Sequence, residues 1–369
     1  MFSNNKAISF NSVVELENAD IFISYADATD NVGKFTIYDG KGKKIINPVQ
    51  FSTSSITFNY SLLLPNGNIF LVYRSNYGYF VIISPEGNII KNVTTFAGKS
   101  IVYLNATVLP NENVFIAYSD SSNKSYGKFV IYDQNGNLVK SETQFYASAV
   151  SCVSVNLLKN GEVLVSFLSD STIAFKFFDQ LGNEITTKTA TTIAYSTDFK
   201  VQVLKNGNFV VVKRDNSTFG GYFYIYDSEG KVVKSNTNFA TRIDSFSVSI
   251  LENGNFVIAY SDDSNGGHKA YIVCSEYGNI IKNGTHFGSE KFADYISALG
   301  LKDGKFLIAY DDTNTSSYGK FEMFEKDLGI SLSSNTLNGE IIDTIFQIDK
   351  FYELVYDGEK YIAKEVRVW

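Results

Sequence analysis

The sequence predicts an all-β fold, a β-propeller of four-stranded antiparallel blades, with eight blades as the preferred count and seven as the alternative. Three observations support this prediction: a phrase that recurs along the whole chain, turn signals that divide each recurrence into four short segments, and a composition suited to strands. The 369 residues include 30 Phe and 24 Tyr against only four Pro, and Phe and Tyr favour strands whereas Pro interrupts them. One domain is expected to cover residues 1–369.

The recurring phrase reads LENGNFVIAY at 251–260 and LKDGKFLIAY at 301–310. The Asn or Asp of its turn serves as the anchor of each unit. The eight anchors are Asn18, Asn66, Asn111, Asn160, Asn206, Asn253, Asp303 and Asp349. The gaps between successive anchors are 48, 45, 49, 46, 47, 50 and 46 residues. Spacing this even predicts about eight repeats of 45–50 residues.

The first and second strands of each unit flank the anchor, as SVSIL at 247–251 and NFVIAY at 255–260 illustrate. Asn-Gly between two apolar runs is a strong hairpin signal, because both turn residues need a positive φ. The second strands are apolar at consecutive positions, so both of their faces must be buried. Sheets stacked face to face around an axis meet that requirement.

The third and fourth strands follow, as GKFVIYD at 127–133 and LVKSETQF at 138–145 illustrate. The turn between them, DQNGN at 133–137, places Asp where it caps the turn and Gly where a left-handed backbone is needed. The fourth strand is the most polar of the four, which suits the outer edge of a blade.

The two ends of the chain decide how the ring closes. The last unit, 341–369, has room for about three strands, which leaves its blade one strand short. The N-terminal stretch 5–10 is expected to complete that blade, unless the blade stays three-stranded. A seven-bladed ring would leave about three strands outside.

The repeat pattern resembles that of a known group of proteins. Leu-x-Asn/Asp-Gly-x-Phe-Val-x-Ala-Tyr, followed by Gly-x-Phe-x-Ile-Tyr-Asp-x-x-Gly-Asn, is similar to the β-propeller repeats of large secreted bacterial adhesins and repeats-in-toxin proteins. Those repeats commonly carry Trp at the positions held here by Tyr25, Tyr73, Tyr118, Tyr260 and Tyr310. The resemblance implies a binding or surface role, an extracellular or cell-surface location, and calcium as a ligand, although this chain has no Asp-x-Asp-x-Asp-Gly calcium loop.

Composition and charge exclude several partners. The net charge of -7 is spread along the chain, and no basic cluster suited to nucleic acid is present. No apolar run reaches the ~18 residues of a membrane helix, so membrane insertion is not expected. The N-terminus lacks the pattern of a signal peptide, which leaves the localisation open apart from the resemblance. Cys152 and Cys274 are expected to be small buried hydrophobes rather than disulfide or metal ligands.

The propeller topology separates two faces. The turns between strands one and two and between strands three and four share one face, and these tight turns vary little between repeats. The loops between strands two and three, together with the blade connections, occupy the opposite face and vary, as SNYG at 75–78 and SDSSNKSYG at 119–127 illustrate. Variable loops on a rigid scaffold are where binding usually resides. We call these two surfaces the turn face and the loop face.

Candidate ligand-binding residues recur on the loop face. An Asp stands just past strand two in six repeats, and aromatic residues lie close by. The candidates are Asp27, Asp120, Asp170, Asp215, Asp262, Asp312, Tyr77, Tyr126, Phe219 and Tyr318. A ring of carboxylates suits cations, sugar hydroxyls or a basic partner, and the aromatic residues suit a sugar ring. The alternative is that each Asp caps its own turn and that the aromatic residues cover the core.

Catalytic and metal sites have weaker support. Within the predicted first strands only Glu15 and Lys200 are charged, and neutral side chains do not supply a tuned acid–base pair. An enzyme would require Glu15, Asp198, Lys200 and Asp244 to meet in one pocket. His268 and His286 belong to the sixth repeat but lack a set of further ligands with metal-site spacing. No metal or other cofactor is therefore predicted.

Three functions remain open at this point. The first is a non-enzymatic binding module that recognises a glycan or a protein surface through the loop face. The second is a structural subunit of a surface layer, fibre or larger assembly, with self-association through the outer strands. The third is a propeller enzyme.

Overall fold

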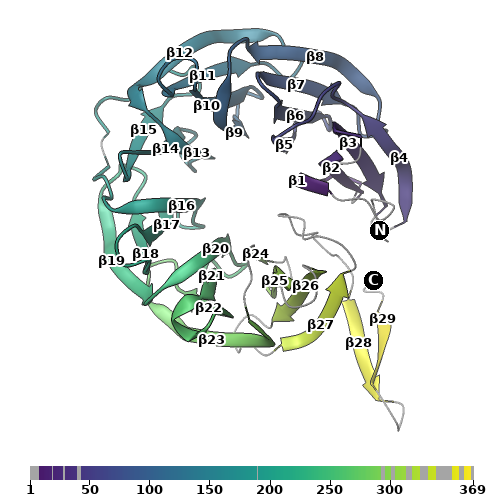
Figure 1. The fold of residues 1–369 in the computed structure, drawn as a ribbon, viewed down its shortest axis with the longest axis vertical. Coiled ribbons are helices and arrows are strands. Elements are labelled where there is room, and N and C mark those ends of the chain that lie inside the picture. The colour runs from purple at the N-terminus through teal and green to yellow at the C-terminus, as the bar shows by residue number, and fades with distance from the viewer. Residues whose placement is uncertain are drawn as a thin grey trace.

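The computed structural model describes residues 8–18, 20–27, 30–39, 43–188, 190–291, 296–300, 304–312, 318–324, 331–337, 351–356 and 361–366. These residues form 29 strands and one short 3-10 turn, η1 (Asp263–Asn265), and they contain no α-helix. The first seven sheets along the chain stand around a central axis, with the first strand of each innermost (Figure 1). The predicted fold class, an all-β propeller of antiparallel blades, is confirmed.

The strands follow the chain in consecutive order within each sheet. Blades one to three contain β1 (Ile8–Glu15), β2 (Ile21–Asp27), β3 (Val32–Tyr38), β4 (Lys44–Gln50), β5 (Phe58–Leu63), β6 (Ile69–Arg74), β7 (Gly78–Ile83), β8 (Ile89–Ala97), β9 (Ile101–Val108), β10 (Val114–Asp120), β11 (Tyr126–Tyr132) and β12 (Leu138–Ala149). Blades four to seven contain β13 (Ser151–Leu157), β14 (Val163–Ser169), β15 (Thr172–Phe178), β16 (Ser196–Val203), β17 (Phe209–Asp215), β18 (Gly221–Tyr226), β19 (Val232–Ala240), β20 (Ile243–Ile250), β21 (Phe256–Asp262), β22 (His268–Cys274), β23 (Ile280–Lys291), β24 (Ile296–Gly300), β25 (Phe306–Asp312), β26 (Tyr318–Phe324) and β27 (Ser331–Leu337).

Three details differ from the regular pattern. Blade four has only β13, β14 and β15, because the segment after β15 makes isolated bridges instead of an outer strand. The eighth repeat contributes the hairpin β28 (Phe351–Tyr356) and β29 (Tyr361–Val366) to the described part, so an eighth blade stays a prediction. Ile8 pairs with Asp27 inside blade one. The expectation that 5–10 completes the last blade is therefore wrong for residues 8–10, and residues 5–7 lie outside the described part.

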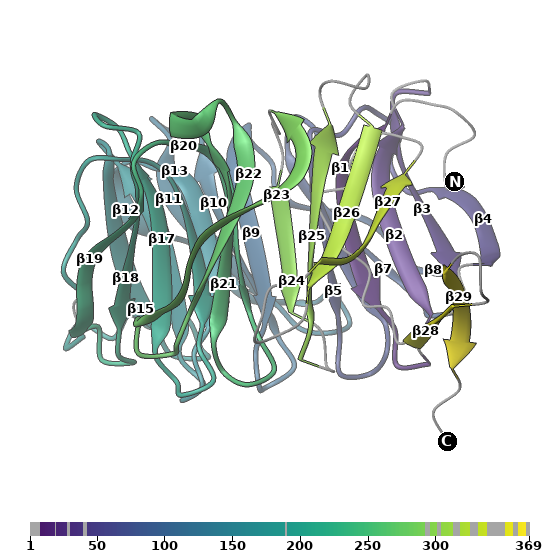
Figure 2. The same cartoon turned by 90° about the horizontal axis from the view of Figure 1, so that it is seen from below.

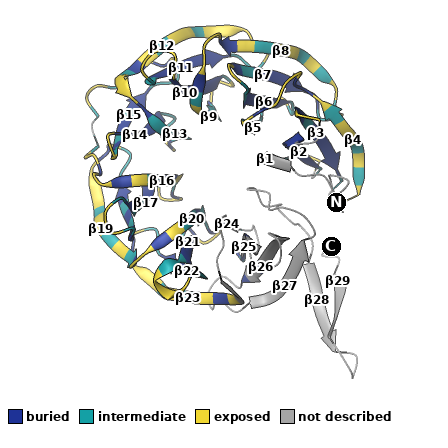
Figure 3. Ribbon diagram, viewed as in Figure 1, coloured by how far each residue is buried: buried dark blue, intermediate teal, exposed yellow. Residues whose placement is uncertain are grey.

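The core lies between neighbouring sheets. The second strands are buried on both faces, as the unbroken burial of β2, β10 and β14 shows, and exposed residues concentrate on the outer strands (Figure 3). Each buried cluster joins two adjacent blades. Phe115 of blade three, for example, stacks on Phe129 with ring centroids 4.5 Å apart and also meets Phe178 of blade four. This stacking explains the consecutive apolar residues of the second strands.

Glycine at the start of the third strand makes room for the Phe near the end of the fourth. A Cβ built on Gly78 would stand 2.3 Å from the Phe96 ring, and one on Gly127 would stand 2.4 Å from Phe145. No side chain tolerates such a distance without displacement of the ring. The Gly and the Phe of the repeat are thus two halves of one packing contact.

Polar residues of the inner strands join neighbouring blades. The hydroxyls of Ser245, Ser247 and Ser249 in β20 accept hydrogen bonds from successive alternate backbone amides of β24, at 3.2, 3.1 and 2.9 Å. Asn105 of β9 similarly accepts from the backbone N–H of Val155 in β13, at 3.0 Å. These short side chains therefore satisfy buried or partly buried backbone donors between the sheets.

Candidate binding face

The second strands end on the loop face at the predicted aspartates. β2, β10, β17, β21 and β25 each finish at such a residue, with Asp27 and Asp120 as the first two examples. Asp170 is an exception, because β14 ends at Ser169 and Asp170 lies in a two-residue turn with φ 47°. Asp170 thus stands just past the second strand, as expected, but one residue beyond the position that the other aspartates share. Ser169 holds that position, and the turn is too short for an Asp-capped loop.

One carboxylate oxygen caps the following loop at four of these residues, Asp27, Asp120, Asp215 and Asp262. Oδ1 of Asp120 accepts hydrogen bonds from the backbone N–H and the hydroxyl of Ser122, at 3.1 and 2.5 Å. Oδ1 of Asp215 accepts the same two bonds from Ser217, at 3.0 and 2.7 Å. Asp262 repeats the arrangement with Ser264. The turn-capping alternative therefore describes these residues in the structure.

The other oxygen contacts a Lys Nζ or a His Nε2, and the strand that supplies this nitrogen differs from blade to blade. Lys34 of β3 and Lys128 of β11 come from third strands, Lys213 of β17 from a second strand, and His286 of β23 from a fourth strand. The Nζ or Nε2 to Oδ2 distances are 2.9 Å for Lys34–Asp27, 2.7 Å for Lys128–Asp120, 3.2 Å for Lys213–Asp215 and 2.9 Å for His286–Asp262. The carboxylates are thus engaged on both oxygens and fix the loops from within.

Electrostatics agree with this arrangement. Burial alone would raise the pKa of Asp215, but hydrogen bonds from Ser217, Thr218 and Lys213 outweigh it and hold that pKa well below the ordinary value. For Asp120, burial is likewise outweighed by Lys128 and Ser122, which lower its pKa. Both groups are therefore ionised at neutral pH, as an ion pair with lysine requires.

The predicted aromatic residues have different environments. Tyr77 is exposed and lies 6.3 Å from Tyr79 between ring centroids. Tyr126 is half-buried at the start of β11. Phe219 is half-buried between two guanidinium groups, Arg214 at 4.8 Å and Arg242 at 5.2 Å from the ring centroid. The backbones of Asp312 and Tyr318 pair between β25 and β26, and their side chains lie outside the described part.

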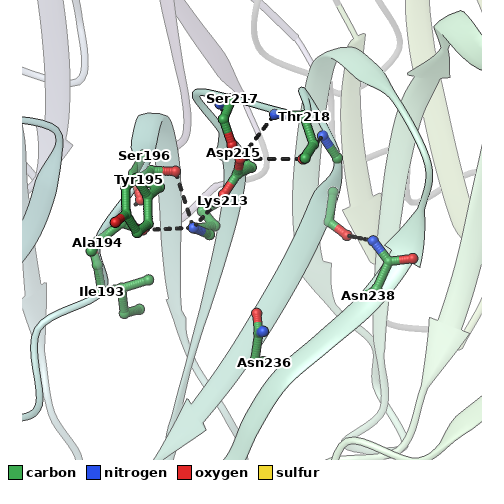
Figure 4. Close-up of polar contacts among 12 residues, drawn as sticks. Ile193, Ala194, Tyr195, Ser196, Lys213, Asp215, Ser217, Thr218, Asn236 and Asn238 are labelled. Atoms are coloured by element: carbon green, nitrogen blue, oxygen red, sulfur yellow. Dashed lines mark hydrogen bonds and ion pairs between the residues drawn. The ribbon is translucent and has the colours of Figure 1, made fainter.

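Two residues that the sequence analysis did not select, Lys213 and Tyr195, contact each other on the loop face of blade five (Figure 4). Lys213 is only 3% exposed. Its ammonium group donates to the carbonyl oxygens of Ala194 at 2.7 Å and Tyr195 at 3.1 Å, beside the Asp215 carboxylate. A signal was present, because LKNGNFVVVK at 204–213 ends in Lys where most repeats have Tyr.

The two histidines lie together in blade six. Their ring centroids are 6.0 Å apart, and Nε2 of His286 is 3.3 Å from the side-chain nitrogen of Asn265. Within the described ranges, no group of three or more His, Cys, Asp and Glu residues is placed to hold a metal ion.

Three of the four charged residues near the axis, Asp198, Lys200 and Asp244, have described side chains. Asp244 pairs with Arg214 at 3.0 Å on the loop face. Asp198 and Lys200 lie near Cys152, where burial first and the Asp198 charge second raise the pKa of the thiol to about 11. A thiol with that pKa is protonated at neutral pH and is a poor nucleophile. The Glu15 side chain lies outside the described part.

Sequence comparisons identify no relative: no protein-family model matches the chain, and no curated protein matches it. Solved structures do resemble it. A polysaccharide lyase of family PL25, an ulvan lyase bound to a GlcA(1-4)Rha3S chain, is 10% identical with a TM-score of 0.54, over 89% of this chain and 96% of that one. The Dos1 propeller is 14% identical with a TM-score of 0.54, over 83% and 75%. Puromycin hydrolase is 10% identical with a TM-score of 0.56, over 98% and 58%.

At these identities the similarity establishes the propeller fold alone. The described residues contain no helix with the length and hydropathy of a membrane span.

Proposed function

We propose that the protein is a non-enzymatic binding module whose loop face recognises a glycan or a protein surface. The observation that carries the proposal is the contrast between the two faces, which lie at opposite rims of the ring in the side view of Figure 2. On the turn face, Asn-Gly and Asp-capped turns repeat with little change. On the loop face, the loops between the second and third strands differ in sequence and in length, from two residues in blade four to five in blade three. An Asp caps this loop in blades one, three, five and six.

The caps and ion pairs support this proposal because they preorganise the loops. Asp120, Asp215 and Asp262 each fix the first residues of a loop, which lowers the entropy that binding would otherwise cost. We further propose that the protein acts at a cell surface in an adhesin-like role and that it binds without a cofactor. The protonated Cys152 thiol and the pairing of Asp244 with Arg214 favour binding over catalysis.

The experiment compares the two faces directly. The protein is labelled and applied to an array of neutral, uronate-containing and sulfated glycans, and to a panel of extracellular matrix proteins. One variant replaces the exposed loop residues Ser121–Lys124 by Gly-Ser residues, and a matched variant changes the turn-face residues Gln134 and Asn135 to Gly and Ser. We expect the wild type to bind at least one ligand on the array or panel. The loop variant should bind that ligand at least several-fold more weakly, and the turn variant should bind it as the wild type does. Equal binding by both variants, or none by the wild type, contradicts the proposal.

A second candidate function, assembly through the outer strands, is favoured by one specific observation. Equivalent positions of five outer strands carry aliphatic side chains that are 46–56% exposed. These residues, which we call the aliphatic belt, are Ile45, Ile90, Val139, Val233 and Ile281. They lie on β4, β8, β12, β19 and β23, whose outer edges have no strand partner in the described sheets. Exposed apolar edge strands are a common route to association.

If the belt drives assembly, the solution mass of the protein rises with concentration. Changing Ile90, Val139 and Val233 to Lys is then expected to return the mass to that of a monomer, because charge on an edge strand opposes pairing. Light scattering coupled to size exclusion measures this. The control is Leu181→Lys, a similarly exposed residue in blade four, which has no outer strand. A monomer at every concentration rules out the assembly function.

A further inference from the structure

We infer that Tyr195 is a stacking platform for a neutral pyranose ring of a glycan. The inference rests on the proposed function and specifies its ligand class at blade five. Tyr195 has the most exposed large apolar side chain among the described residues, at 66%. It immediately precedes β16, on the segment that replaces the outer strand of blade four.

The backbone at Tyr195 is strained. Its φ is +56°, in the left-handed region that bulky residues seldom adopt. Gly would adopt this conformation without penalty. An aromatic side chain in solvent gains little from packing, so folding alone does not explain Tyr at this position. Strained backbone conformations of this kind are concentrated at functional sites, where a side chain must be held in one direction.

Several hydrogen bonds hold the strained residue. The Tyr195 carbonyl oxygen accepts from the backbone N–H of Asn216 at 3.0 Å and from Lys213 Nζ at 3.1 Å. The neighbouring Ala194 carbonyl accepts from the same ammonium at 2.7 Å. The base beneath the exposed ring is therefore fixed by a buried cation, as Figure 4 shows.

Blade five departs from the repeat to supply that cation. In blades one and three, a Tyr of the second strand pairs across to a Lys of the third, as Tyr118 pairs with Lys128. Blade five exchanges the two, so that Lys213 pairs with Tyr222. The exchange moves the ammonium to the carbonyls under Tyr195. A buried ammonium is costly unless fully hydrogen-bonded, and here two of its three acceptors, the carbonyl oxygens of Ala194 and Tyr195, belong to the Tyr195 turn, while the third is the Asp215 carboxylate.

The surroundings indicate an uncharged ligand. The adjoining loop exposes Ser217 and Thr218, whose hydroxyls donate to Asp215 and keep lone pairs that accept from sugar hydroxyls. The nearby cations are already neutralised, Arg214 by Asp244 at 3.0 Å and Arg242 by Asp263 at 3.6 Å. The apolar C–H face of a pyranose ring complements the Tyr195 ring, and no unpaired arginine is offered to a uronate or sulfate.

The test uses Tyr195→Gly, which removes the ring and relieves the backbone. The wild type is screened against neutral oligosaccharides (glucans, mannans, galactans and xylans) and against uronate and sulfated sets, and the best neutral binder is titrated by calorimetry. We expect Tyr195→Gly to lower its affinity about tenfold or more, with an unchanged or higher melting temperature. Tyr195→Trp should retain binding. The control is Tyr277→Gly, a comparably exposed Tyr on the turn face with 61% exposure, which should leave affinity unchanged.

The outcomes separate this inference from the proposed function. Full affinity of Tyr195→Gly for the neutral glycan overturns the platform and leaves the glycan-binding function standing. Binding restricted to uronate or sulfated glycans overturns the ligand class, again with the function intact. A wild type that binds matrix protein but no glycan overturns the inference alone, whereas a wild type that binds nothing overturns both.

Discussion

Replacing Gly136 by Ala is expected to lower the free energy of unfolding by about 3 kcal/mol, the sum of a left-handed backbone penalty and an overpacking penalty. Gly136 belongs to the turn between β11 and β12, and its φ is +74°. A Cβ there would stand 2.8 Å from the ring of Phe80, which belongs to the preceding blade. The substitution therefore strains the turn and separates two blades at once.

The matched control is Gly67→Ala. Gly67 has a similar φ of +82°, but a Cβ built on it meets nothing within 4 Å. Only the conformational penalty should appear, at about 1 kcal/mol. Urea unfolding of both variants measures the difference. Equal destabilisation would mean that the contact between the turn and the neighbouring blade adds nothing to stability.

Replacing Lys213 by Met is expected to cost about 3 kcal/mol of unfolding free energy. The change leaves the Asp215 carboxylate without its cation and removes the donor to the Ala194 and Tyr195 carbonyls. Removing one partner of a buried ion pair is far more destabilising than the pair is stabilising. Asp215 keeps its bonds from Ser217 and Thr218, which places the effect at the lower end of the usual range.

An exchange of residues provides the control for Lys213. Lys213→Tyr alone should destabilise, whereas Lys213→Tyr combined with Tyr222→Lys recreates the arrangement of Tyr118 and Lys128 in blade three and should recover part of the loss. Chemical unfolding of the two single variants and the double variant gives the coupling energy. Additive effects would show that the cross-strand exchange carries no compensation.

The fold was predictable because its signals are local. Asn-Gly turns, doubly buried second strands and polar outer strands each follow from a few adjacent residues, and the repeat multiplies them. Blade four was harder, because the segment after β15 begins with the turn phrase of the other repeats, DQLGN at 179–183, and a missing outer strand has no positive signature. The closure expectation failed for residues 8–10 because an inner strand can extend beyond its apolar core, as β1 does.

The position of the aspartates and their turn-capping role were predictable, but the partners of their second oxygens were not. The spacing from the anchor located the ends of the second strands, and only Asp170 was displaced, by one residue. The partners of the carboxylates were not visible, since the nitrogen that contacts Oδ2 comes from the third strand for Asp120, the second for Asp215 and the fourth for Asp262. Tyr195 was missed because it has no counterpart in the other repeats.

The consecutive strand order within every described sheet bears on how such a chain arises and is made. A gene duplication of one 45–50-residue unit inserts a whole sheet, with its own hairpins and its own Gly–Phe contact, between two surfaces that already fit it. During translation, each sheet can complete its backbone hydrogen bonds before the next unit is synthesised. Only the apolar face that packs on the next blade stays exposed until that blade has formed. The number of blades is then a quantity that evolution can adjust by whole steps without redesigning the interfaces.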